Sequence, residues 1–253
     1  MNAKECLDEY LVYHDVRPST AAFYKRCVTV WVRANGELID SRKLSEWLGD
    51  LKAQGKSDYY RRSLKNGLQA LLRANGDEGK IRPIRCEPLD HNFWSAEDVR
   101  RLIDAAKDNW WKSLIAAGWC TGFSQIDLVD RLRRDQIRQD GVVVTRRSKT
   151  GKLVVGQLEN WVLEILPATD PVWKWGKSWE MFRKRFRNFV WKARLQGSFK
   201  TLRRSAAASV EAAHREQAHR FLGNTRQVCE RHYLPASLLV GDALRPESLR
   251  RSG

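Results

Sequence analysis

The side chains best suited to chemistry gather in a few short strings in the second half of the sequence. In chain order these are Thr121–Leu128 (TGFSQIDL), Ser148–Lys152 (SKTGK), Lys200–Arg204 (KTLRR) and Phe221–Asn224 (FLGN), followed nine residues later by Tyr233. Ammonium and guanidinium groups bind phosphate oxygens, and arginine does so with two N–H groups at once. The strings therefore indicate chemistry on an anion, with a tyrosine hydroxyl close by in the sequence.

The charge of the chain points to the same kind of ligand. Its 253 residues include 46 Lys and Arg against 30 Asp and Glu, a net charge of +16. Residues 1–90 hold 16 basic and 13 acidic side chains, whereas residues 91–253 hold 30 and 17, so the excess lies in the later part. An excess of this size is typical of a protein whose partner is a polyanion.

Composition excludes several other classes of protein. A hydrophobic fraction of 42% with 11 Trp is too high for a disordered basic tail. No apolar run approaches the roughly 20 residues of a membrane span, so we expect no membrane partner. The five Cys are widely spaced and form no C-x-x-C pair, which excludes a disulfide framework and a cysteine-rich zinc site.

The elements that must position these strings begin with a helical domain, which we expect over residues 1–80. Apolar periodicity predicts helices at Cys6–Tyr13, after Ser19 or Thr20, after Ser41, and after Ser57 or Asp58. In the last of these helices, Arg61, Arg62 and Lys65 are expected to point away from the leucine face. Two prolines and the loss of periodicity predict a linker over residues 81–93.

A second domain, residues 94–253, is predicted to combine helices with one β-hairpin. Ser95–Asp98 is a capping-box pattern that starts a helix, and Trp110–Cys120 is a strongly apolar helix. The β-rich runs Gly141–Arg147 and Lys152–Leu158 flank a turn and predict an antiparallel hairpin. Further helices are expected at Met181–Ala193, Thr201–Ala213, Arg215–Leu222 and Thr225–His232, with Phe182, Phe186 and Phe189 in the core. The predicted fold class is mainly α with a small antiparallel β-sheet.

In order and spacing, the strings resemble those of the tyrosine recombinases, the phage-integrase family. Members carry T-G-x-R-x-x-E/D, a lysine in a turn, H-x-L-R, L-G-H, and a nucleophilic tyrosine nine residues after the last histidine. The resemblance covers the whole chain and implies a helical, SAM-like core-binding domain followed by a catalytic-type domain. It also implies double-stranded DNA as the partner, a role in recombination or integration, and chemistry that needs neither a cofactor nor a metal.

The resemblance implies a role for three matching positions. In the family, the tyrosine attacks a DNA phosphodiester, which gives a 3′-phosphotyrosyl link and a 5′-hydroxyl, while arginines stabilise charge on the phosphoryl oxygens. Tyr233 stands at the nucleophile position, and Arg203 stands at the position of the second arginine. Lys149 stands at the position of the turn lysine that protonates the leaving 5′ oxygen.

Three other positions depart from the family pattern. Ser124 stands in place of the first arginine, Lys200 in place of the first histidine, and Asn224 in place of the second histidine. Asn224 can still donate a hydrogen bond to phosphate, whereas Lys200 is a poor general base at neutral pH. Ser124 replaces a bidentate cation by a short neutral hydroxyl, and removal of one such donor costs about 10²–10³ in rate. We therefore expect a DNA-binding protein that is impaired in strand cleavage.

Alternative interpretations stay open at this point. The chain would be an active recombinase if Arg146, Arg147 or Arg204 replaced the missing arginine. It would be a basic interaction module if only the scaffold were retained and the partner were a protein or RNA. Ser124 has a structural interpretation as the first residue of a capping box through Asp127. Lys149 and Tyr233 also have simple interpretations, as a solvated turn lysine and a half-buried tyrosine.

The expected contacts with DNA are basic side chains from both domains: Arg61, Arg62, Lys65, Arg146, Arg147, Arg183, Lys184, Arg187 and Arg204. The expected protein partners are an intact recombinase or further copies of this chain. An apolar segment after Tyr233, with Leu238, Leu239, Val240 and Leu244, either docks on a neighbouring subunit or folds back on its own core. The expected location is the cytoplasm, in association with the nucleoid.

Overall fold

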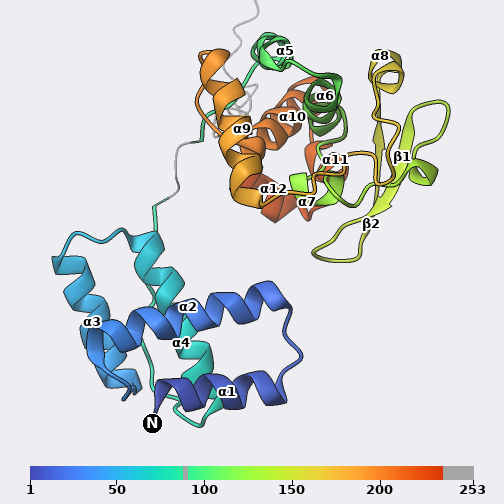
Figure 1. Ribbon diagram of the computed structural model, residues 1–253. Coiled ribbons are helices and arrows are strands. Elements are labelled where there is room, and N and C mark those ends of the chain that lie inside the picture. The colour runs from blue at the N-terminus through green and yellow to red at the C-terminus, as the bar shows by residue number, and fades with distance from the viewer. Residues whose placement is uncertain (88–90, 236–253) are drawn as a thin grey trace, which may run out of the picture. The chain divides into compact units, whose positions relative to one another are not determined.

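The computed structural model describes residues 1–87 and 91–235. The chain divides into two compact units, Met1–Leu89 and Asp90–Gly253 (Figure 1). In the part of the chain that the structure describes, no helix is both long and apolar enough to cross a membrane. The apolar segment around Leu238–Leu244 lies outside the described residues.

The first unit is a bundle of four helices. They are α1 (Ala3–Tyr13), α2 (Pro18–Asn35), α3 (Ser41–Ala53) and α4 (Asp58–Ala74). Their apolar faces meet in one core, where Trp31, Leu44 and Leu68 are fully buried. Ile81 packs against the same core, although the sequence placed it in the linker.

Three of the predicted helix starts in this unit are wrong. Helix α1 begins at Ala3, before the predicted Cys6, with Asn2 at the N-cap. Helix α2 begins at Pro18 with Arg17 at the N-cap, because proline is favoured in the first turn, where its missing N–H costs nothing. Helix α3 is capped by Asp40, whose carboxylate accepts a hydrogen bond from the Lys43 amide at 2.7 Å. Ser57 caps α4 as predicted.

The second unit contains the remaining helices and the only strands among the described residues. In chain order its elements are α5 (Ala96–Ala105), α6 (Asn109–Thr121), α7 (Gln125–Leu128), a 3₁₀ turn (Arg134–Gln136), β1 (Val142–Arg146), β2 (Leu153–Gln157), α8 (Asn160–Glu164), α9 (Trp179–Lys192), α10 (Phe199–Ala213), α11 (Ala218–Leu222) and α12 (Arg226–Tyr233). β1 and β2 pair antiparallel, with Val144 opposite Val155. The predicted fold class, mainly α with a small antiparallel sheet, is confirmed.

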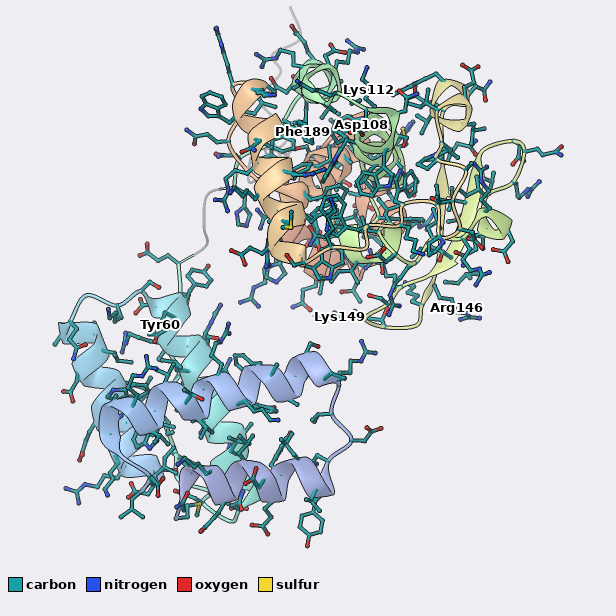
Figure 2. The ribbon with its side chains drawn as sticks, in the orientation of Figure 1. Tyr60, Asp108, Lys112, Arg146, Lys149 and Phe189 are labelled. Carbon is teal, nitrogen blue, oxygen red and sulfur yellow. The ribbon has the colours of Figure 1, made fainter. Side chains whose placement is uncertain are left out.

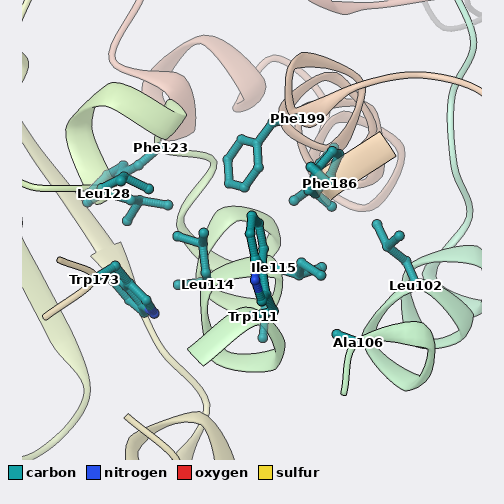
Figure 3. Packing of buried hydrophobic residues seen from close by; sticks show 14 of the residues in the cluster. Leu102, Ala106, Trp111, Leu114, Ile115, Phe123, Leu128, Trp173, Phe186 and Phe199 are labelled. Carbon is teal, nitrogen blue, oxygen red and sulfur yellow. The ribbon is translucent and has the colours of Figure 1, made fainter. Parts of the chain in front are cut away.

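Helix α6 is the centre of the second unit and packs against α5, α8, α10 and β2. Figure 3 shows Trp111 of α6 within the core, near Phe186 of α9 and Phe199 of α10. Helices α6 and α10 approach closely at Gly118, where an added Cβ would lie 2.7 Å from the Phe199 ring. The predicted burial of Phe182 and Phe186 is confirmed, while Phe189 is half-buried at the edge of this core.

Candidate functional site

The residues singled out from the sequence meet at one pocket of about 510 Å³ in the second unit. Five of the six positions matched to the family motifs line it: Ser124, Lys149, Lys200, Arg203 and Tyr233. They come from the start of α7, the β1–β2 turn, α10 and the end of α12. Lys149 lies on the loop of the hairpin in Figure 2. Segments up to about a hundred residues apart in sequence therefore form a single site.

The pocket is strongly cationic. Its lining contains one carboxylate, Asp127, and six cationic side chains: Arg147, Lys149, Arg183, Arg187, Lys200 and Arg203. Arg183 and Arg187 project from the exposed face of α9, as the sequence predicted. A concave surface lined by one sign of charge concentrates counter-ions, so this pocket favours an anionic ligand.

The single carboxylate of the pocket already accepts hydrogen bonds from other parts of the protein. Asp127 is buried, and its Oδ2 accepts a hydrogen bond from the Ser124 hydroxyl at 2.7 Å. Its Oδ1 accepts from the backbone N–H of Ser148 at 2.8 Å. Ser124 occupies the N-cap position of α7, but its side chain caps no backbone N–H, so the predicted capping box is wrong. Asp127 instead ties α7 to the turn that carries Lys149.

Arg203 is held by the ends of two helices. Its guanidinium is buried, and it donates from Nη1 to the carbonyl of Gly122 and from Nη2 to that of Leu222 at 3.2 Å. Gly122 adopts φ +60° where α6 ends, a left-handed conformation that glycine accepts without strain. The Tyr233 ring lies over this guanidinium, with 5.3 Å between the arginine Cζ and the ring centroid. Arg203 thus contacts both the carbonyl of the Thr-Gly string and the ring of Tyr233.

Arg147 also lines the pocket, and its guanidinium contacts the sixth matched position. Its Nη1 donates to Oδ1 of Asn224 at 2.8 Å. The other two proposed substitutes for the missing arginine do not line the pocket. Arg146 is exposed and donates to the carbonyl of Gly151 at 3.1 Å. Arg204 donates from Nε to the carbonyl of His232 at 3.1 Å, and burial lowers the pKa of its guanidinium.

Several buried donors around this pocket lack a partner. Within residues 1–87 and 91–235, four buried side-chain nitrogen atoms form no hydrogen bond, and three of them belong to Arg147 (Nε), Arg203 (Nε) and Asn224 (Nδ2). Native proteins pair almost all buried polar groups, so a cluster of unpaired donors calls for an explanation such as a ligand. Because the unpaired atoms are all donors, that ligand must supply acceptor oxygens.

The basic residues of α4 are placed differently from the expectation. Arg61 is buried, with Nε donating to the Leu48 carbonyl at 2.9 Å and Nη1 to Asp58 at 2.6 Å, so its predicted solvent-facing position is wrong. The Leu48 carbonyl belongs to α3, so the apolar period of α4 does not indicate this partner. Arg62 is half-buried over the Tyr59 ring, and burial lowers the pKa of the Lys65 ammonium. Lys184 is exposed on α9 outside the pocket.

Sequence reasoning missed three features of the site. It gave Asp127 no part beyond a helix cap, although the family pattern places an acidic residue there. It did not foresee that Arg147 pairs with Asn224, since nothing in the sequence brings residues so far apart together. Phe199, which lines the pocket, lies outside the predicted helix because Thr201 was taken as the start of that helix.

Comparisons with known proteins identify the fold. No family model matches the sequence, and no curated protein matches it. Among solved structures, a lambda integrase dimer matches with a TM-score of 0.74 at 17% identity, covering 92% of this chain and 95% of that one. A lambda integrase tetramer matches with a TM-score of 0.69 at 17% identity, covering 89% and 75%. The Tn1549 transposon integrase matches with a TM-score of 0.68 at 10% identity, covering 93% and 95%. The structure that this sequence adopts therefore shares its fold with lambda integrase and the Tn1549 integrase.

Proposed function

We propose that this protein binds double-stranded DNA in a recombination or integration system and holds one backbone phosphate in the cationic pocket. The observation that carries the proposal is the set of unpaired buried donors on Arg147, Arg203 and Asn224 within or beside a pocket lined by six cationic side chains. A phosphodiester supplies the acceptor oxygens and the negative charge that this arrangement lacks. The excess of basic residues beyond residue 90 provides the further phosphate contacts that binding to duplex DNA requires.

The structural neighbours support this proposal. The lambda integrase dimer is bound to a core site, and the tetramer is bound to a Holliday junction. The Tn1549 integrase is in complex with transposon right end DNA. By analogy of fold, we propose that this chain also associates with further copies of itself, or with an intact recombinase, on DNA.

We further propose that strand cleavage is impaired. Cleavage would form a bond between Tyr233 Oη and phosphorus, with the phenol proton passing to solvent. It would break the P–O5′ bond, with Lys149 giving a proton to the departing oxygen. Tyr233, Lys149 and Arg203 share the pocket, so these roles have candidates. At position 124, however, a neutral hydroxyl is already bonded to Asp127 and offers no charge to the transition state. Lys200, which stands at the position of the first histidine, is exposed.

The DNA-binding proposal is tested by fluorescence anisotropy with a labelled duplex of arbitrary sequence over a range of salt concentrations. Six to ten phosphate contacts give a log–log slope of roughly −5 to −9. A single-stranded RNA of the same length is the comparison, since an RNA-binding module would prefer it. Absence of duplex binding at about 50–100 mM salt, or binding that does not depend on salt, would remove the proposal.

A further inference from the structure

We infer that Arg147 and Asn224 form a phosphate-binding pair that makes up, in DNA binding, for the arginine absent at position 124. The inference rests on the proposed function. Arg147 Nη1 donates to Asn224 Oδ1 at 2.8 Å, which joins the end of the hairpin to the segment after α11. Arg147 lies in the lining of the pocket next to Lys149. A cation that lines the pocket is thus coupled to an amide from a separate segment.

The hydrogen bond between the two residues leaves a donor on each of them. Nε of Arg147 and Nδ2 of Asn224 are both buried and have no partner. Because the amide oxygen accepts from the guanidinium, the NH₂ end of Asn224 must serve a different acceptor. Leaving two buried donors unpaired is costly in the unliganded protein, and an anionic oxygen satisfies both. A guanidinium also presents Nε–H and one terminal N–H along a single edge, the geometry that binds phosphate bidentately.

The backbone holds both partners in place. The Arg147 N–H donates to the Lys152 carbonyl, and the Gly151 N–H donates to the Arg147 carbonyl, both at 2.9 Å. On the other side, Gly223 precedes Asn224 with φ +62°, and an added Cβ there would lie 2.5 Å from Val154 Cγ1. The hairpin and α11 therefore touch at the glycine directly before Asn224. The pair is set by that contact and not by two mobile surface side chains.

Arg203 cannot replace the pair. Both of its terminal nitrogen atoms donate to backbone carbonyls, so it offers the pocket less of its guanidinium than Arg147 does. The pair serves binding and not the rate of cleavage. Hydrogen bonds to phosphate that are fully formed once DNA is bound stabilise the bound state and the transition state equally. They tighten binding without accelerating the reaction.

The test compares Arg147→Gln with Arg146→Gln. The two substitutions remove the same charge from neighbouring residues, but Arg146 is exposed and lies outside the pocket. We expect Arg147→Gln to weaken binding of a labelled duplex about tenfold more than Arg146→Gln does, as loss of a charged hydrogen bond predicts. Asn224→Ala should reproduce part of that loss, and it should add little in the double variant with Arg147→Gln. Equal losses for Arg147→Gln and Arg146→Gln overturn the inference and leave DNA binding itself intact, whereas absence of binding by the unaltered chain overturns both.

A second measurement uses the unaltered chain and does not depend on whether Arg147→Gln folds. In ¹⁵N-labelled protein, the Nε–H signal of Arg147 is assigned by its loss in Arg147→Lys. We expect this signal to shift when duplex DNA is added, because the Nε–H acquires an acceptor, while the signal of Arg146 moves less. A purely structural arginine would keep the same Nε–H signal with and without DNA, and that result overturns the inference.

Discussion

The hydroxyl of Ser124 donates to the carboxylate of Asp127 at 2.7 Å, and the same carboxylate accepts the backbone N–H of Ser148 at 2.8 Å. One buried acidic side chain thus links the position of the missing arginine to the turn that carries Lys149. The hydrogen bond to Ser148 thereby ties the turn that carries Lys149 to α7.

Asp127→Ala should loosen that turn. Loss of the buried acceptor leaves the Ser148 N–H without its carboxylate, so we expect the free energy of unfolding to fall by about 2–3 kcal/mol. The Ser148 amide should also exchange its hydrogen faster. Urea unfolding and hydrogen exchange measure the two effects. Asp104→Ala, at an exposed position on α5, is the matched control and should change stability by less than about 0.5 kcal/mol. Equal behaviour of the two variants would show that Asp127 has no such role.

Gly223→Ala should separate the hairpin from α11. The residue has φ +62°, and its new Cβ would lie 2.5 Å from Val154 Cγ1. Gly151→Ala provides the comparison, because Gly151 has φ +67° but no atom within 4 Å of an added Cβ. Backbone strain of about 1–2 kcal/mol is common to both variants, and only Gly223→Ala adds the clash. Thermal unfolding should therefore place Gly223→Ala well below Gly151→Ala, and similar transition temperatures would contradict the packing described.

Charge reversal on α9 should weaken DNA binding without changing sequence preference. Arg183→Glu and Arg187→Glu each place a carboxylate in the lining of the pocket, so we expect losses of about tenfold or more for any duplex, as for phosphate contacts. Arg185→Glu makes the same charge change on the same helix outside that pocket, where the arginine lies over the Trp175 ring. Anisotropy titrations with two unrelated duplexes give the comparison. A larger loss of affinity for Arg185→Glu would show that the DNA-binding face lies elsewhere.

The buried thiols should make stability depend on pH in the alkaline range. Burial raises the pKa of Cys229 from its ordinary value of 9.0 to about 11. In the unfolded chain this thiol ionises first, so its contribution to stability is complete below about pH 9 and is lost as the pH rises toward 11. Urea unfolding at several pH values should show a smaller alkaline loss for Cys229→Ala than for the unaltered chain. The same alkaline loss in both proteins would contradict this assignment.

The sequence predicted most of the fold because its local signals agree with the packing. The apolar stripe of α4 and the hairpin around Gly151 were found from periodicity and turn residues, and the Ser95 capping box forms as expected. The capping box at Ser124 failed because Asp127 has a stronger partner, the Ser148 N–H, in a distant segment. The prediction for Arg61 failed for a similar reason, since its guanidinium donates to the Leu48 carbonyl of α3. Such tertiary competition leaves no trace in the local pattern.

The candidate site, like the fold, was predictable only in part. The motif spacing predicted that Lys149, Arg203 and Tyr233 belong together, and the structure brings them into one pocket. Which arginine of the hairpin would line the pocket with Ser124 depended on how the hairpin packs on α11. Periodicity treats Arg146 and Arg147 as equivalent basic residues, and only the contact with Asn224 distinguishes them.

The most direct test of the account is covalent trapping of the chain on a nicked duplex. The unaltered protein should give little or no protein–DNA adduct on a denaturing gel, because no cation at position 124 stabilises the transition state. Ser124→Arg should raise adduct formation by about 10²–10³, the effect of restoring one charged donor. Adding Tyr233→Phe to that variant should abolish the adduct and leave duplex binding unchanged. Abundant adducts from the unaltered protein that disappear in Tyr233→Phe would contradict the account and show that the pocket is complete without an arginine at position 124.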